Sequence, residues 1–322
     1  MHVKISAIEY SLPSKIETEK NLKKDNPKWN IKKIINATGI KKRYISLDKD
    51  TVVSLGIQTV KKVLRKVPKN SIKGIIFVTQ TPDYTLPSCS AIIQHKLNLP
   101  SNCLAFDINL GCSGFVYALS VAGSLIKSQI CKNILIVCGD TYSKSIDKND
   151  SGCRPIFSDG VAAIFLEKSN NDSLGPFVLG TDGSGYKDLM IKNSGFLQEK
   201  KIKKKLYMNG KKIFLFSMSK IPSNINDLLK KSKKKIKNID MFIFHQASKI
   251  LLQNLMKKIK IPINKFYTNI HKIGNTTSAS IPIALKQAYN EQKIKKGNLI
   301  LIAGFGVGLS WGSCIIKWDK LK

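Results

Sequence analysis

The chain has 322 residues, 43% of them hydrophobic, which is enough for a substantial core. No apolar run approaches the roughly 18 residues of a membrane span and the first residues lack a secretory-signal pattern, so we expect a cytoplasmic protein that does not bind membranes. Seven cysteines without a CxxC pair or zinc-like spacing predict reduced thiols and no metal site.

The net charge of +33 comes from lysines spread along the chain, while arginine, the preferred base-reading residue, occurs only at positions 43, 65 and 154. We therefore expect an acidic protein partner and no nucleic acid, and keep a basic nucleic-acid-binding protein as the non-enzymatic alternative.

Strand-like and helix-like patterns alternate through the first half of the chain. Near-continuous apolar runs, typical of strands covered on both faces, occur at 73–81, 103–110, 133–140 and 160–168. Helical spacing follows the first two of these runs, at 87–99 and 115–128. The N-terminus is predicted to form an opening strand. This alternation predicts an α/β fold.

The second half repeats the same plan. A strand and turn at 241–248 precede a helix at 249–259, a small-residue turn opens an apolar helix at 274–289, and two strands around a glycine turn occupy 298–318. We expect two similar halves, 1–170 and 171–322. Two lysine-rich segments interrupt the second half: 182–212 is expected to be a surface excursion, and 228–238 to end a helix and lead into a strand.

Cys112 is the candidate nucleophile. It lies between a predicted strand and a predicted helix, flanked by Gly111 and Ser113-Gly114. A helix N-terminus favours a thiolate over a thiol, and the glycines allow a substrate to approach the backbone. The alternative is a small buried cysteine in a tight turn.

Three further features carry polar groups at predicted strand or helix ends. His245 follows the apolar run 241–244, Asn275 lies in the turn before the apolar helix, and Gly304–Gly308 joins the last two strands. An imidazole at a strand end can donate a hydrogen bond, and a glycine turn can present backbone N–H groups to an oxyanion. The alternatives are a core histidine, an ordinary turn asparagine and a plain hairpin.

Together these features resemble the thiolase superfamily, and more closely the β-ketoacyl-acyl-carrier-protein synthase III family. The matching motifs span the chain in order: GCSG around Cys112, FSDG at 157–160, HQA at His245, GNT at Asn275, and FGVGLSWG at 305–312. The resemblance implies a duplicated αβαβα fold whose two pseudo-symmetric halves each hold a mixed five-stranded sheet. It also implies a homodimer.

The same resemblance implies roles for individual residues. Cys112 would take an acyl group from a thioester, with the backbone N–H groups of Cys112 and Val307 holding the oxyanion. His245 and Asn275 would bind the malonyl carbonyl while CO2 leaves, and the resulting carbanion would attack the acyl group. The substrates would be acyl-coenzyme A or acyl carrier protein and malonyl carrier protein, without cofactor or metal. The remaining expected contacts are a substrate pocket with Leu86, Phe305 and Gly306, and a carrier or coenzyme A entrance with Lys33, Lys249 and Arg154.

The chain departs from this family at the coenzyme A clamp. Ala37 replaces an expected arginine, Trp29 lies about four residues too early, and Ser248-Lys249-Ile250 follow the HQA motif. We therefore expect acyl carrier protein to be the preferred priming donor. The motifs GTDGSG at 180–185 and GNTTSASIP at 274–282 resemble those of relatives that make acyl groups for surface sugars or secondary metabolites. A related acyltransferase or a hydroxymethylglutaryl-type synthase on the same fold is the alternative activity.

Overall fold

The computed structural model describes residues 2–171, 173–197 and 204–322. In this structure the apolar runs of the first half form strands of one sheet. The strand order is β1 (His2–Ser11), β7 (Gly160–Ser169), β6 (Asn133–Asp140), β4 (Gly74–Val78) and β5 (Leu104–Ile108). β4 runs parallel to β5 and β6, whereas β7 is antiparallel to β6 and to β1. Every residue of β4 is buried, as expected for a strand covered on both faces.

The second half forms a sheet of the same pattern. Its order is β8 (Leu174–Thr181), β13 (Ser310–Lys317), β12 (Leu299–Gly306) and β11 (Met241–Phe244). The β11–β12 pair is parallel and the other two pairs are antiparallel, so this order matches β1-β7-β6-β4 of the first sheet.

The predicted fifth strand of the second sheet is wrong for the residues that the structure describes. Its place beside β11 is taken by one isolated bridge between Phe242 and Phe266. The short helix η5 (Ile263–Lys265) precedes the bridge and α8 (Ile270–Ile273) follows it, so too few extended residues remain for a strand.

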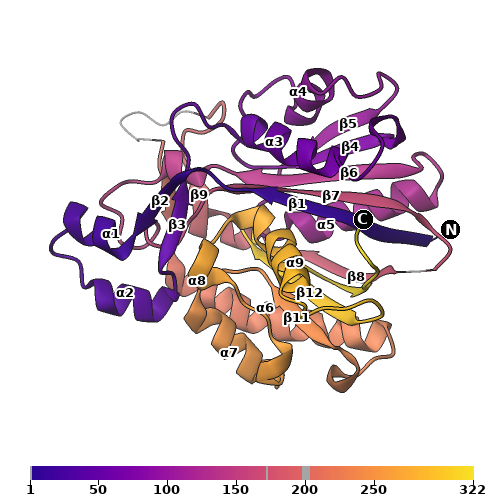
Figure 1. The fold of residues 1–322 in the computed structure, drawn as a ribbon. Helices are drawn as coiled ribbons and strands as arrows, with labels where there is room; N and C mark the ends of the chain where they lie inside the picture. Colours follow the sequence, from indigo (N-terminus) through magenta and orange to yellow (C-terminus); the bar gives the residue numbers. More distant parts are fainter. Residues whose placement is uncertain (1, 172, 198–203) are drawn as a thin grey trace.

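Five layers result, and they confirm the predicted duplicated αβαβα architecture (Figure 1). α5 (Gly114–Lys127) and α9 (Ser280–Asn290) lie between the sheets and share one core cluster with strands of both. α3 (Val52–Leu64) and α4 (Cys89–Lys96) cover the outer face of the first sheet. α6 (Gly210–Lys231) and α7 (Lys249–Ile259) cover the outer face of the second.

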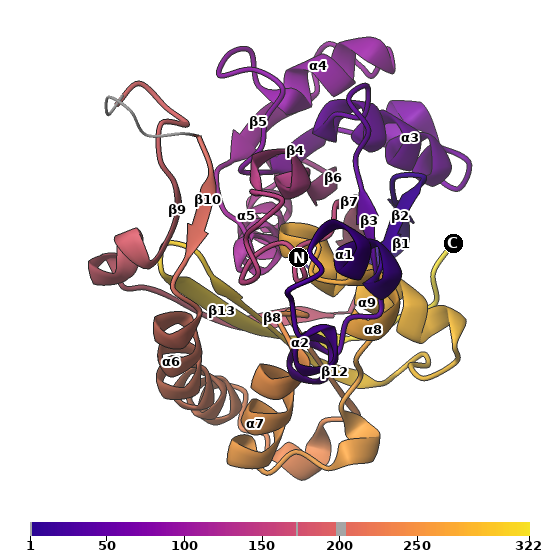
Figure 2. The same ribbon diagram turned by 90° about the vertical axis from the view of Figure 1, so that its left-hand side faces the viewer.

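Smaller elements lie at one side of these layers, where Figure 2 shows them toward the viewer. They are β2 (Lys15–Thr18), α1 (Glu19–Asp25), α2 (Ile31–Thr38) and β3 (Lys42–Ile45), with β2 and β3 pairing antiparallel. The expected surface excursion at 182–212 contains η3 (Gly183–Asp188), and β9 (Leu189–Ile191) paired with β10 (Leu206–Met208); its residues 198–203 lie outside the described part.

The segment 228–238 ends α6 and leads into β11, as predicted. The boundary between halves at 170/171 stays a proposal, which is supported by its place between the last strand of one sheet and the first strand of the other.

Candidate active site

Cys112 lies in the turn that connects β5 to α5, and only 6% of its surface is exposed. The end of β12 runs directly beside it: a β-carbon added at Gly306 would lie 2.9 Å from both Cβ and Sγ of Cys112. Real side chains essentially never approach so closely, so glycine at 306 is what lets the two segments meet. The glycine turn predicted near the C-terminus is therefore a wall of the cysteine site.

Two backbone N–H groups converge on the Cys112 sulfur. They belong to Cys112 itself and to Val307, and both lower the pKa of the thiol. The loop that carries Val307 is fixed by Ser310, whose hydroxyl donates to the Val307 carbonyl at 2.8 Å and lies 2.7 Å from the Ser113 hydroxyl. Both N–H groups thus lie beside the atom that the sequence predicts to be the nucleophile.

The predicted low thiol pKa is wrong. Burial raises the pKa of Cys112 to about 12, and the nearby Asp140 carboxylate raises it further against the two N–H groups. α5 begins at Gly114, two residues beyond the cysteine, and the thiol is enclosed by protein. The resting residue is therefore a neutral thiol.

His245 follows β11 and is 2% exposed. Its Nδ1 lies 2.7 Å from the Ser280 hydroxyl, and its ring packs edge-on against Phe305 with centroids 5.7 Å apart. Burial lowers the pKa of His245 to about 3, although a hydrogen bond with the Thr277 backbone opposes the shift. The imidazole is thus neutral at physiological pH, and a Ser280 hydroxyl that donates to Nδ1 leaves the ring proton on Nε2.

Asn275 is held by backbone bonds on both sides. Its N–H donates to the Ile156 carbonyl at 3.1 Å, and its carbonyl accepts from the Ser158 N–H at 2.8 Å. The side-chain Oδ1 accepts from the Thr277 N–H at 2.9 Å, so the donors of this amide are those of Nδ2.

Cys112, His245 and Asn275 line a single cavity of about 130 Å³. The predicted pocket residues Phe305 and Gly306 line it too, and most of the remaining wall is apolar: Ile156, Phe157, Leu189, Met208, Ile213, Phe214 and Leu251. An apolar wall with a few convergent polar groups is typical of a small-molecule site. The structure therefore brings the predicted catalytic residues together.

Three other predicted contact residues lie away from this cavity. Leu86 is 79% exposed, before α4. Lys33 is exposed on α2, and Lys249 begins α7, where it borders a separate groove of about 500 Å³ between α2 and α7.

Arg154 was also expected at the entrance, and the structure contradicts this role. Its guanidinium is buried and donates to Glu17, to Asp25 and to the Lys148 carbonyl. Glu17 pairs with the buried Arg43 as well, so Arg154 belongs to an internal ion-pair network and is not free for a carrier phosphate.

Sequence reasoning missed Asp140, at the end of β6. This buried carboxylate accepts from the Gln80 N–H at 2.7 Å, from the Ser278 hydroxyl at 2.8 Å and from the Thr277 hydroxyl. Burial raises its pKa, which these hydrogen bonds oppose. Asp140 thereby joins the first half to the loop that carries Asn275. The usable signal was an acidic residue after the apolar run 134–138.

Among the described residues, no group of three or more His, Cys, Asp or Glu side chains could hold a metal ion. No helix in the described part of the chain is long and apolar enough to cross a membrane. None of the seven cysteines, all of which lie in the described part of the chain, forms a disulfide bond.

Comparisons with known proteins agree with this geometry. Residues 106–183 match the sequence model of 3-oxoacyl-(acyl-carrier-protein) synthase III, and residues 229–318 match the model of its C-terminal part. A β-ketoacyl-(acyl-carrier-protein) synthase III of Clostridium perfringens is 40% identical over 292 residues, which cover 88% of this chain and 90% of the relative. A Clostridium novyi relative of the same name is 36% identical over 328 residues, 99% of each chain. A crystal structure of a 3-oxoacyl-(acyl-carrier-protein) synthase III superposes with a TM-score of 0.96 at 33% identity, over 99% of this chain and 100% of that one.

Proposed function

Because the chain belongs to the β-ketoacyl-(acyl-carrier-protein) synthase III family of condensing enzymes, we propose that Cys112, His245 and Asn275 carry its two half-reactions. Cys112 takes an acyl group from a thioester in the first. In the second, a malonyl group on acyl carrier protein loses CO2 and its carbanion displaces Cys112 from the acyl group. The product is a 3-oxoacyl carrier thioester. The observation that supports this most is that all three side chains line one cavity.

Acyl loading requires an electrophile held beside the sulfur. The N–H groups of Cys112 and Val307 would bind the oxyanion of the tetrahedral intermediate, and their position beside the sulfur supports this role. The Cys112–acyl bond forms as the bond to the carrier thiol breaks. The thiol proton of Cys112 ends on the departing carrier thiol, so the half-reaction balances without a cofactor.

Decarboxylation requires donors for the enolate oxygen. Nε2–H of His245 and Nδ2–H of Asn275 supply them when Nδ1 accepts from Ser280 and Oδ1 accepts from Thr277. Since the His245 pKa is about 3, the ring donates as a neutral group throughout the physiological range. Loss of CO2 leaves the electron pair on carbon, so no base is needed to form the carbanion.

The separation of the half-reactions gives a direct test. In His245→Ala and Asn275→Ala variants we expect acetyl loading of Cys112 to stay close to the parent rate, while condensation with malonyl carrier protein falls by roughly 10²–10³-fold. Intact-mass analysis follows loading and product mass follows condensation. His95→Ala is the matched control, because His95 is exposed on α4 and lines neither the cavity nor the groove beside Lys249. Equal loss of both half-reactions would refute this division of roles.

We also propose that the active form is a homodimer and that it is cytoplasmic. β5 is an edge strand of the first sheet, all of its residues are only partly buried in one chain, and Leu86 nearby is largely exposed. An exposed edge strand favours pairing with a second copy. A stable, active monomer in sedimentation at micromolar concentration would rule the dimer out. Seven cysteines without a disulfide bond among them are consistent with a reducing compartment, which cell fractionation can check.

A further inference from the structure

The FSDG motif at 157–160 lies beside the loop that carries Asn275. Phe157 pairs with Asn275 in an isolated parallel bridge. The two hydrogen bonds of this bridge join Asn275 to the Ile156 carbonyl and to the Ser158 N–H. The carbonyl of Phe157, a buried residue, is therefore left for a donor from another segment.

Arg43, on β3, supplies that donor. Its Nη1 donates to the Phe157 carbonyl at 2.7 Å. The aliphatic part of the same side chain packs against the other segment of the bridge, because a β-carbon on Gly274 would lie 3.4 Å from Cγ of Arg43. Arg43 thus contacts both segments of the bridge that holds Asn275.

The Arg43 guanidinium is itself fixed by an ion pair. Burial, and after it the positive charge of Arg154, lowers the pKa of Arg43 to about 9, so the group is charged at neutral pH and needs an anionic partner. That partner is Glu17 on β2, which also pairs with Arg154 at 2.6 Å. Asp25 pairs with Arg154 in turn, so two arginines and two carboxylates balance in charge.

The backbone of β3 runs along the same motif. The Tyr44 N–H donates to the Ser158 hydroxyl at 2.8 Å, and the Asp159 N–H donates to the Tyr44 carbonyl at 2.8 Å. The Ser46 N–H donates to the Asp159 carboxylate at 2.8 Å. The position of Arg43 relative to the bridge is therefore set both by its ion pair and by its neighbours in the strand.

Arg43 has a route to the chemistry but no place in it. Phe157 and Asn275 line the Cys112 cavity, whereas Arg43 does not. Its side chain can therefore influence the reaction only through the bridge. The N–H groups proposed for acyl loading, those of Cys112 and Val307, belong to other segments.

Resting on the proposed function, we infer that Arg43 is a positioning residue for the decarboxylation half-reaction. Its contacts with the Phe157 carbonyl and with Gly274 fix the backbone of the Asn275 loop. That backbone aims Nδ2–H of Asn275 at the enolate oxygen. Acyl loading of Cys112 does not depend on Arg43.

The test is a double-mutant cycle that follows both half-reactions. In Arg43→Met, Glu17 keeps Arg154 as its partner, so we expect a folded protein that loads Cys112 at close to the parent rate. Its kcat for condensation with malonyl carrier protein should fall at least about tenfold, since a misplacement of about 1 Å can cost about 10²-fold. The double variant Arg43→Met/Asn275→Ala should match Asn275→Ala alone within about threefold, because Arg43 acts through Asn275.

Two further variants sharpen the comparison. Arg65→Met is the matched control, because this arginine is exposed at the end of α3 and should keep both half-reactions at the parent rate. Arg43→Lys keeps the charge beside Glu17 but lacks the planar fork that reaches Glu17 and Phe157 together. It should lose condensation and keep loading even if the methionine variant does not fold.

The outcomes separate the inference from the function on which it rests. Losses that multiply in the double variant would overturn the inference. So would folded Arg43 variants that condense at the parent rate or that lose loading and condensation equally. Asn275→Ala, measured alongside, would still support the proposed function if it loses condensation alone. If Asn275→Ala itself does not separate the half-reactions, both the function and the inference fail.

Discussion

At Cys112 two electrostatic effects oppose each other. A helix N-terminus stabilises a nearby anion by about 0.3–1 kcal/mol in typical cases. Full burial can shift a pKa by about 3–5 units, each worth about 1.4 kcal/mol. Burial is the larger effect, and the helix begins only after the cysteine. The thiol pKa of about 12 follows from this balance, so Cys112 is protonated at neutral pH in the absence of substrate.

The raised pKa has a measurable consequence for the free enzyme. The thiolate fraction of Cys112 should increase about tenfold per pH unit through the neutral and mildly alkaline range, because the whole range lies below the pKa. Alkylation by iodoacetamide, followed by intact mass with Cys112→Ala as the background, should therefore accelerate continuously up to about pH 10. A rate that levels off near pH 7 would show instead the low-pKa thiolate expected from the sequence.

At the scale of elements, hydrophobic periodicity predicted the strands closely. The run at 133–140 is β6 itself, the run at 160–168 matches β7 within one residue, and the predicted helix at 249–259 coincides with α7. These segments are continuous in sequence and buried on defined faces, so local pattern was sufficient. The candidate site could be located from the sequence because Cys112 and His245 each adjoin the end of a predicted strand.

The predictions that failed concern contacts between segments that are far apart in the sequence. Arg154 is neutralised by Glu17, 137 positions away, and Asp140 binds Ser278, 138 positions away. The isolated bridge at Phe266 depends on how the chain leaves α7. No local sequence pattern identifies the distant partner in any of these contacts, and the Cys112 pKa depends on tertiary burial in the same way.

The glycine wall beside Cys112 gives an element-scale prediction. In Gly306→Ala the new β-carbon meets the cysteine at 2.9 Å, so the end of β12 or the sulfur must shift. A displacement of this kind can reduce turnover by about 10²-fold, and crowding a packed site costs about 1–3 kcal/mol of stability. Gly183→Ala is the control, because nothing lies within 4 Å of its β-carbon position. Parent-like acyl loading and stability in Gly306→Ala would contradict this account of the wall.

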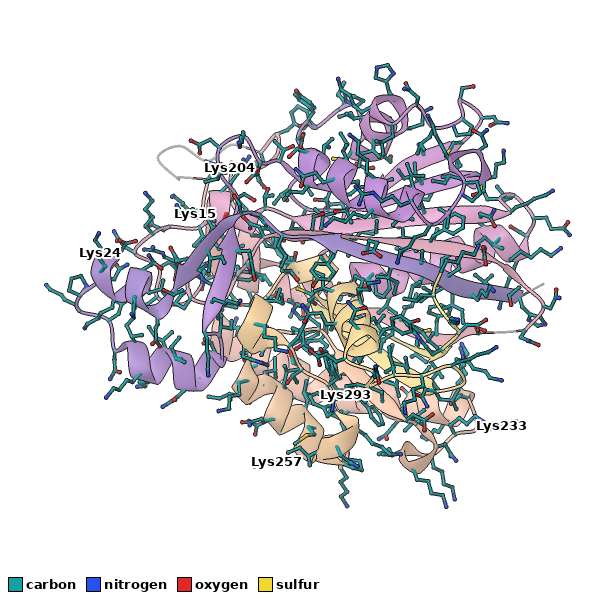
Figure 3. All side chains as sticks on the ribbon, viewed as in Figure 1. Lys15, Lys24, Lys204, Lys233, Lys257 and Lys293 are labelled. Carbon is teal, nitrogen blue, oxygen red and sulfur yellow. The ribbon has the colours of Figure 1, made fainter. Side chains whose placement is uncertain are left out.

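At the scale of the whole molecule, the excess of lysine covers widely separated parts of the surface. Labelled lysines from Lys15 on β2 to Lys257 on α7 lie far apart in Figure 3. Such a distribution creates a positive field around the molecule rather than one groove for nucleic acid. We propose that this field favours acyl carrier protein, an acidic donor, over coenzyme A, whose expected clamp residues are replaced by Ala37, Ser248 and Ile250.

The dependence of Cys112 loading on ionic strength tests this preference for acyl carrier protein. Screening lengths fall from about 30 Å at 0.01 M to about 8 Å at physiological ionic strength, so long-range attraction should weaken as salt rises. Loading of Cys112 from acetyl carrier protein should exceed loading from acetyl coenzyme A at low salt, and the ratio should shrink at high salt. Acetyl pantetheine, which is uncharged, is the control and should be insensitive. If acetyl coenzyme A loads Cys112 as fast as acetyl carrier protein at every salt concentration, the preference for carrier protein is excluded.

The central claim is that Cys112 is a covalent carrier of the acyl group between two half-reactions. Incubation with an acetyl thioester alone should add a single acetyl mass to the parent protein and none to Cys112→Ala. Adding malonyl carrier protein should then remove that mass and yield acetoacetyl carrier protein in equal amount. An adduct that persists in Cys112→Ala, or a product that forms while the Cys112 adduct remains undischarged, would contradict the account.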